Sequence, residues 1–97
     1  MRIISRKALR KFWQKYPDAE HPLQTWYADV KHAAWKKPSD IKTSYRSASF
    51  LQNNRVVFNI KGNNYRIIVI VQYKNGVVYI RFVGTHREYD QIDANTI

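Results

Sequence analysis

The chain has no cysteine among its 97 residues. It therefore has no disulfide, no thiolate nucleophile and no cysteine-based zinc site, and it needs no oxidising compartment. It also lacks an apolar run of signal-peptide length and any stretch that approaches the roughly 20 apolar residues of a membrane span. From these absences we expect a cytoplasmic protein with no membrane partner.

Glycine is scarce, and its three positions are Gly62, Gly76 and Gly84. They form neither a phosphate-binding glycine loop nor a G-x-S-x-G nucleophile motif, which excludes those routes to nucleotide and acyl-transfer chemistry. His21 and His32 show no ligand spacing typical of a metal site. A hard cation near the C-terminus would compete with the surrounding positive charge, although acids are present there: Glu88, Asp90 and Asp93. We expect no metal and no cofactor.

Acidic residues are also few: 7 Asp and Glu face 17 Lys and Arg, giving a formal net charge of +10. A field of this strength attracts polyanions, because phosphates that bind the protein release their condensed counterions. Nucleic acid is therefore the leading partner and an acidic protein the second. Charge that only maintains solubility is a third interpretation.

The length suits a single domain over residues 1–97, and 44% hydrophobic with 14% aromatic residues can fill its core. Helical spacing marks a first helix between Ser5 and Pro17, with an apolar stripe at Ala8, Leu9, Phe12, Trp13 and Tyr16. A second helix runs from Pro22 toward Pro38, with its stripe at Leu23, Trp26, Tyr27, Val30 and Ala34.

From Arg55 onward the pattern changes to period two in three segments, residues 55–62, 64–74 and 77–84. They predict an antiparallel meander, preceded by a helical turn around Asp40–Ser44 and a brief strand near Ser49–Leu51. The fold class is thus α+β: two N-terminal helices packed on one face of a twisted antiparallel β-sheet, followed by a short C-terminal helical turn.

Asn75-Gly76 predicts a two-residue type I′ hairpin, because both central positions of that turn need positive φ. In this register Gln72 pairs with Tyr79 and Arg66 pairs with Thr85. The core side then includes Val69, Val71, Val78, Ile80 and Phe82. The other side has no acid and collects Arg55, Asn59, Lys61, Arg66, Gln72, Lys74, Tyr79, Arg81 and Thr85. We interpret it as an anion-binding surface, with an ordinary solvated face as the alternative.

The last strand is followed by a group of titratable residues. Thr85 can cap a short helix on which His86 and Asp90 are four residues apart, so that Asp90 can orient the imidazole. Tyr89 is one position away. Beside Arg66 and Arg81, such a histidine suits proton transfer on a phosphate ester. The alternative is a capped terminal turn with a surface ion pair.

Three stretches, KALRKFWQKYPDA, VVFNIKGNNYRIIVIVQY and VYIRFVGTHREYD, resemble the HigB toxins of the RelE-like toxin superfamily. The resemblance spans nearly the whole chain and implies a ribosome-dependent mRNA endonuclease. It also implies a cognate antitoxin of HigA type, a helix-turn-helix protein that binds operator DNA. By this resemblance Arg66, Lys61 and Arg81 hold the scissile phosphate. The resemblance also implies that the catalytic groups include His86, Tyr89 and Asp90.

The resemblance implies attack of the RNA 2′-hydroxyl on the adjacent phosphate, which needs no metal and cannot occur on DNA. Some relatives carry a further histidine on the sheet, whereas this sheet has none. The partner of His86 in acid–base catalysis is therefore open between Tyr89 and Lys61, unless substrate positioning does most of the work. Two other functions remain: a non-catalytic RNA-binding module, and a toxin that acts through a protein partner.

Overall fold

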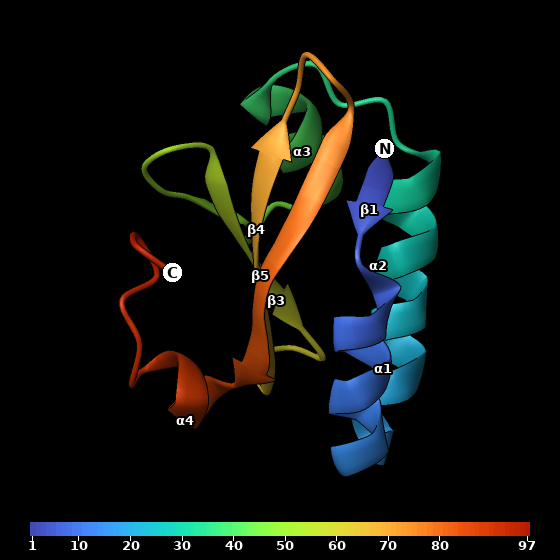
Figure 1. Ribbon diagram of the computed structural model, residues 1–97, viewed down its shortest axis with the longest axis vertical. Coiled ribbons are helices and arrows are strands. Elements are labelled where there is room, and N and C mark those ends of the chain that lie inside the picture. Colours follow the sequence, from blue (N-terminus) through green and yellow to red (C-terminus); the bar gives the residue numbers. More distant parts are fainter.

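The computed structural model describes residues 1–97 and has the α+β architecture expected from the sequence (Figure 1). Its elements are β1 (Arg2–Ile4), α1 (Arg6–Lys15), the 3-10 turn η1 (Pro17–Ala19), α2 (Glu20–His32), α3 (Pro38–Ser44), β2 (Ser49–Phe50), β3 (Arg55–Ile60), β4 (Tyr65–Gln72), β5 (Val77–Thr85) and α4 (His86–Tyr89). The five strands form one sheet in the order β1-β5-β4-β3-β2, antiparallel except for β1. No helix is long and apolar enough to span a membrane.

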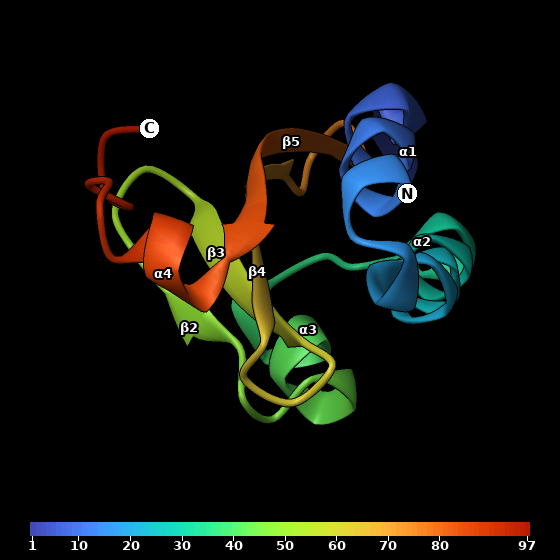
Figure 2. The ribbon, with the colours of Figure 1, turned by 90° about the horizontal axis from the view of Figure 1, so that it is seen from below.

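Helices α1, α2 and α3 lie on one side of the sheet, and α4 with the C-terminal segment lies on the other (Figure 2). Period-3.6 spacing explains the contacts of α1, which buries Leu9 and Phe12 and leaves its lysines and arginines exposed. The side chains of α2 that join them in the core are Leu23, Trp26 and Val30. The alternate residues of β3 and β4 complete this core from the sheet: Val56, Phe58, Ile60, Tyr65, Ile67, Val69 and Val71.

The second helix ends at His32, six residues before the expected stop at Pro38. Ala33 is extended, with ψ 155°, and Ala34 is exposed rather than part of an apolar stripe. Proline suits the first turn of a helix, and Pro38 accordingly begins α3 instead of closing α2. The extended connection brings Trp35 into the core, where its ring stacks on Phe58 at a centroid distance of 6.1 Å.

Strand β1 was not predicted from the sequence. Its three residues are too few to show a period, and it pairs in parallel with β5, more than seventy residues further along the chain, as in the pair Ile3↔Val78. The expected short elements before β3 are both present, as α3 and β2.

The predicted hairpin register is wrong. Gln72 pairs with Val77, so the connection has four residues, Tyr73 to Gly76, and only Gly76 takes positive φ (68°). The two-residue turn expected at Asn75-Gly76 needs positive φ at both positions, a condition that Asn75 does not meet. The Asn-Gly dipeptide predicted a two-residue turn, but the observed four-residue loop shifts the pairing of β4 and β5 by two residues.

A β-bulge changes the register again, because Ile68 pairs with Phe82 while Val69 pairs with Ile80. Arg81 is the extra residue, and beyond it every side chain of β5 changes face relative to simple alternation. Phe82 was expected in the helix-side core, but it lies on the opposite face beside Ile68. Val57 and Ile68 are buried on that face, so the C-terminal side of the sheet has a small apolar layer of its own.

Candidate functional site

The short helix α4 is closed by reciprocal bonds at its N-terminus. Thr85 Oγ1 accepts from the main-chain N–H of Glu88 at 3.0 Å, and Glu88 Oε1 accepts from the N–H of Thr85 at 2.9 Å. The cap predicted at Thr85 is confirmed. The role of Glu88 was missed, although a Thr-x-x-Glu sequence is a known signal for this capping box. The capping box thus fixes the point at which β5 ends and α4 begins at His86.

His86 and Asp90 form the pair predicted from their spacing. Nδ1 of His86 lies 3.0 Å from Oδ2 of Asp90, and both side chains are about half exposed, at 51% and 55%. Because an ionised carboxylate can only accept, Nδ1 carries the proton in this bond. Asp90 therefore sets the ring orientation and leaves Nε2 of His86 for a ligand.

Arg66 from β4 reaches the same region. Its Nη1 donates to the main-chain oxygen of Asn63 at 2.9 Å, and its Cζ lies 5.6 Å from the centre of the Tyr89 ring. A guanidinium over an aromatic face is attracted by the ring quadrupole. Tyr89 also packs against Phe82, with ring centres 6.5 Å apart. The bulge that turned Phe82 toward this face thus supports Tyr89, which in turn contacts Arg66.

The turn between β3 and β4 links Arg66 to His86. While the oxygen of Asn63 accepts from the Arg66 side chain, the oxygen of Asn64 accepts from the main-chain N–H of His86 at 3.0 Å. One four-residue turn therefore positions a cation and an imidazole that are 20 residues apart in the sequence.

Lys61 does not lie with Arg66 on the face predicted for it. The strand ends at Ile60, and Lys61 adopts the left-handed conformation with φ 52°, so strict alternation no longer applies. Its Nζ bonds Oδ2 of Asp18 at 2.8 Å, and the hydroxyl of Tyr65 also donates to this carboxylate. Both bonds lower the pKa of Asp18, and the bond from Lys61 has the larger effect. The bond to Asp18 raises the pKa of Tyr65 to about 12.

The remaining predicted phosphate contacts are dispersed. Asn59 pairs with Arg66 and so lies beside it, whereas Arg66 itself pairs with Gly84 instead of Thr85. Arg55 lies four residues from Asn59, about 13 Å along the strand, and donates from Nε and Nη2 to the main-chain oxygen of Ile97 at 3.1 and 2.7 Å.

Tyr79 and Arg81 were also predicted to lie on the anion-binding surface. Tyr79 is at the level of Arg55, because both pair with Ile70. Arg81 is exposed at the bulge and forms no ion pair. The structure therefore brings together Arg66, His86, Tyr89, Asp90 and Asn59, and it separates Arg55, Lys61 and Tyr79 from them. No group of three or more His, Asp or Glu side chains is arranged to hold a metal ion.

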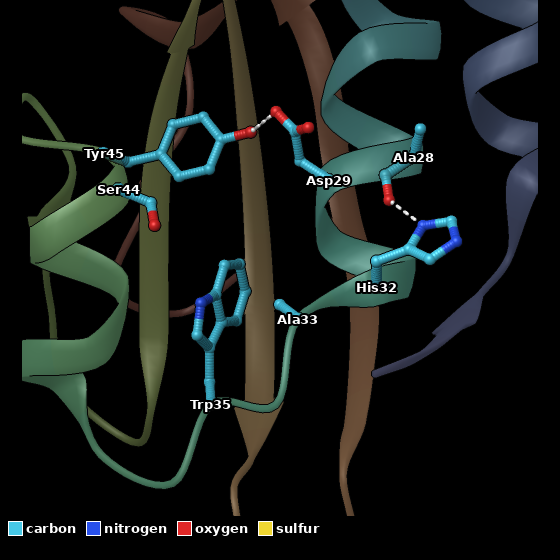
Figure 3. A pocket seen from close by; sticks show the side chains of 7 residues that line it. All are labelled: Ala28, Asp29, His32, Ala33, Trp35, Ser44 and Tyr45. Carbon is cyan, nitrogen blue, oxygen red and sulfur yellow. Dashed lines mark hydrogen bonds between the residues drawn. The ribbon is translucent and has the colours of Figure 1, made fainter.

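A pocket on the helix side of the sheet is lined by the end of α2, the connection after it and the end of α3 (Figure 3). Tyr45 donates to Asp29 at 2.8 Å across it, and His32 Nδ1 lies 2.8 Å from the oxygen of Ala28. Burial raises the pKa of Tyr45, and the bond to Asp29 raises it further, so the hydroxyl stays protonated. These polar groups satisfy one another, and the pocket shares no residue with the cluster at α4.

Residues 19–92 match the family described as HigB_toxin, RelE-like toxic component of a toxin-antitoxin system. The chain belongs to the HigB family. The match contains α4 and every residue of the cluster around it. The resemblance inferred from the sequence is thereby confirmed.

Curated HigB proteins extend the similarity over almost the full chain. The mRNA interferase toxin HigB of Escherichia coli K12 is 33% identical over 97% of this chain and 92% of its own length. The mRNA interferase HigB of Shigella flexneri gives the same identity and coverage. That of Escherichia coli O6:H1 is 27% identical over 95% of this chain and 91% of its own length.

Proposed function

We propose that this HigB-family chain is an mRNA interferase, an endoribonuclease that cuts messages on the ribosome. The observation that carries the proposal is the convergence of Arg66, His86 and Tyr89 at the end of the central strands, in a chain whose net charge is +10. HigB relatives of this chain are mRNA interferases, in agreement with this activity.

The reaction we propose is attack of the 2′-hydroxyl oxygen on the adjacent phosphorus. A bond from O2′ to phosphorus forms and the bond from phosphorus to O5′ breaks, leaving a 2′,3′-cyclic phosphate and a 5′-hydroxyl. One proton leaves the 2′-hydroxyl and one is delivered to O5′. Negative charge accumulates on the phosphate oxygens between these events, where a fixed cation lowers the barrier most.

In this scheme the guanidinium of Arg66 stabilises the developing charge, with Asn59 beside it on β3. Nε2 of His86 performs one of the two proton transfers, and Asp90 holds the ring. Asp18 engages Lys61, so the hydroxyl of Tyr89 is the better candidate for the second transfer. Arg81 is exposed and unpaired and remains a proposed phosphate contact. No step requires a metal, and DNA has no nucleophile to offer.

Family membership makes the chain the toxic component of a toxin-antitoxin system. We propose further that its antitoxin is of HigA type, with a helix-turn-helix that binds operator DNA, and that both act in the cytoplasm. The toxin has few acidic residues and a net charge of +10. We therefore expect an acidic surface on the antitoxin, because opposite charges accelerate association.

Cleavage of a message by purified protein in a translation reaction tests the activity. We expect discrete cuts within the reading frame, with fragments that end in cyclic phosphate. Replacing the ribose at one mapped cut by 2′-deoxyribose should abolish that cut and no other. A message that stays intact at protein excess would leave only an RNA-binding module or a toxin that acts through a protein partner. Cuts that survive the 2′-deoxy substitution would refute the chemistry.

A further inference from the structure

A second group of cations lies at the opposite end of the molecule from α4. A cavity of about 580 Å³ opens between the start of β1, the end of α2 and the turn between β4 and β5. Its volume is in the range of ordinary ligand sites. Four basic side chains line it, and they come from three separate parts of the chain: Arg2, Lys31, Lys36 and Lys74. We call it the basic cavity.

Hydrogen bonds fix the walls of the basic cavity. The amino group of Met1 donates to the main-chain oxygens at the end of α2, including Ala33 at 2.7 Å. The main-chain N–H of Arg2 donates to the oxygen of Gly76 at 2.8 Å, which ties β1 to the turn. The cavity is therefore part of the folded structure. Tyr73, which is partly exposed, forms an aromatic wall, while Trp35 also lines the cavity but is buried in the core.

The four cations have no anionic partner within the chain. None of their side chains forms an ion pair or a hydrogen bond, and all four residues are exposed. Asp40 lies beside this region, because it accepts from the main-chain N–H of Lys36 at 2.9 Å. Burial raises the pKa of Tyr73, and the charge of Asp40 raises it further. A single carboxylate cannot neutralise four positive side chains, so the cavity presents a concentrated field to an incoming anion.

We propose that the basic cavity binds the phosphodiester backbone of RNA at a second position, separate from the cluster at His86. Several cations around one hollow suit a polyanion better than a single small anion, because each neutralised phosphate releases counterions. An aromatic wall beside a basic groove is also typical of sites for single-stranded nucleic acid. The proposal rests on RNA being the substrate, and it adds where a distant part of the RNA is held.

The geometry sets the length of RNA that can reach both positions. The turn that lines the cavity precedes β5, and α4, which begins at His86, follows β5 at the other end of the strand (Figure 1). Nine residues of strand span about 26 Å. At about 3.4 Å for each stacked nucleotide, the two positions are about eight nucleotides apart. A message longer than this could occupy both, or the cavity could hold RNA of the ribosome while the message occupies the other site.

The test is a comparison of two double variants with equal loss of charge. Lys31→Ala with Lys74→Ala removes two cations from the cavity, and Lys7→Ala with Lys11→Ala removes two exposed cations from α1. Binding of 2′-O-methyl oligonucleotides, which cannot be cleaved by 2′-hydroxyl attack, is measured against salt concentration at lengths of about 4 and about 16 nucleotides. Affinity for purified ribosomes is measured in parallel. Neither measurement depends on cleavage, so the result stands whether or not the proposed nuclease activity does.

For the wild type we expect a steeper salt dependence with the long oligonucleotide than with the short one. In the cavity variant the slope for the long oligonucleotide should flatten by about 1.4, the value for two single-strand phosphate contacts. The α1 variant should lose at most about half as much. A loss in the cavity variant confined to ribosome binding would support the proposal with ribosomal RNA as the ligand. Equal behaviour of both variants in both assays would overturn it.

Discussion

Lys61 and Asp18 join the turn after β3 to the turn that follows α1, with Nζ and Oδ2 2.8 Å apart across 43 residues of sequence. The same turn after β3 supplies the oxygens of Asn63 and Asn64, which hold the Arg66 guanidinium and the main-chain nitrogen of His86. Asp18 touches neither Arg66 nor His86, yet it restrains the segment that positions both.

We therefore expect Asp18→Asn to lower kcat of message cleavage about 10-fold with little change in KM, because a misplaced catalytic group affects the transition state most. Glu20→Gln removes a nearby carboxylate outside this network and should leave kcat unchanged. Cleavage kinetics on one message check both variants. If Asp18→Asn and Glu20→Gln have the same kcat, the ion pair does not position the site.

The pKa of Asp18 is lowered in the folded protein, first by Lys61 and then by Tyr65. A lowered carboxyl pKa contributes stability above the unfolded-state value, and this contribution disappears as the pH falls through the folded-state value. The wild type should thus be more stable than Asp18→Asn at pH 7, and the difference should shrink as the pH falls below about 4, vanishing below the folded-state pKa. Urea unfolding at several pH values measures it. A difference that is constant from pH 7 to pH 3 would show that the charge of Asp18 contributes nothing.

Arg66→Ala should reduce cleavage by about 10²- to 10³-fold, the usual cost of removing one fixed donor from a developing oxyanion. Arg66→Lys keeps the charge but loses the planar fork and should recover only part of the rate. Arg81→Ala should also lose activity if Arg81 contacts the phosphate. Lys11→Ala, on the exposed face of α1, serves as the control for charge. Growth arrest on induction, at matched expression, gives the same ranking in cells, and full toxicity of Arg66→Ala would remove the central assignment.

His86→Gln should slow single-turnover cleavage by about 10²- to 10⁴-fold, because glutamine keeps the size and hydrogen bonding but cannot transfer the proton. Single-turnover rates of the wild type and the variant, measured over a range of pH, check this prediction. Superimposable pH profiles with similar rates would make His86 structural. The acid–base assignment would then pass to Tyr89.

Gly84→Ala should damage the site through packing. A Cβ at Gly84 would collide with the ring of Phe82, which packs against Tyr89. Overpacking of this kind costs about 1–3 kcal/mol and would displace Tyr89 from Arg66. Adding Phe82→Leu should recover part of both stability and activity. Urea unfolding and cleavage rates of the single and double variants check this, and strictly additive losses would contradict it.

The predictable parts of the molecule were those set by local pattern. Helical spacing located α1 and most of α2, and period two located β3, β4 and β5. The His86–Asp90 pair followed from one turn of helix. Each of these depends on residues within a few positions of one another, where side-chain direction follows directly from the backbone period.

The errors came from features that the local pattern does not contain. The four-residue connection after Gln72 shifted the register by two residues without changing faces, and the extra residue at Arg81 then moved Phe82 to the other face. Lys61 left its expected face because a left-handed residue ends the strand period. Its partner Asp18 is 43 residues away and could not be inferred from any spacing.

The position of β5 between β1 and β4 also orders events during synthesis. The first strand of the chain can pair only after Val77 to Tyr79 have been made, and α4 follows later still. A nascent chain of 76 residues thus has no partner strand for β1 and lacks α4, however well α1 and α2 have formed. If the proposed site is correct, a chain that stops anywhere before β5 should be harmless, and toxicity should begin only near the completion of each molecule.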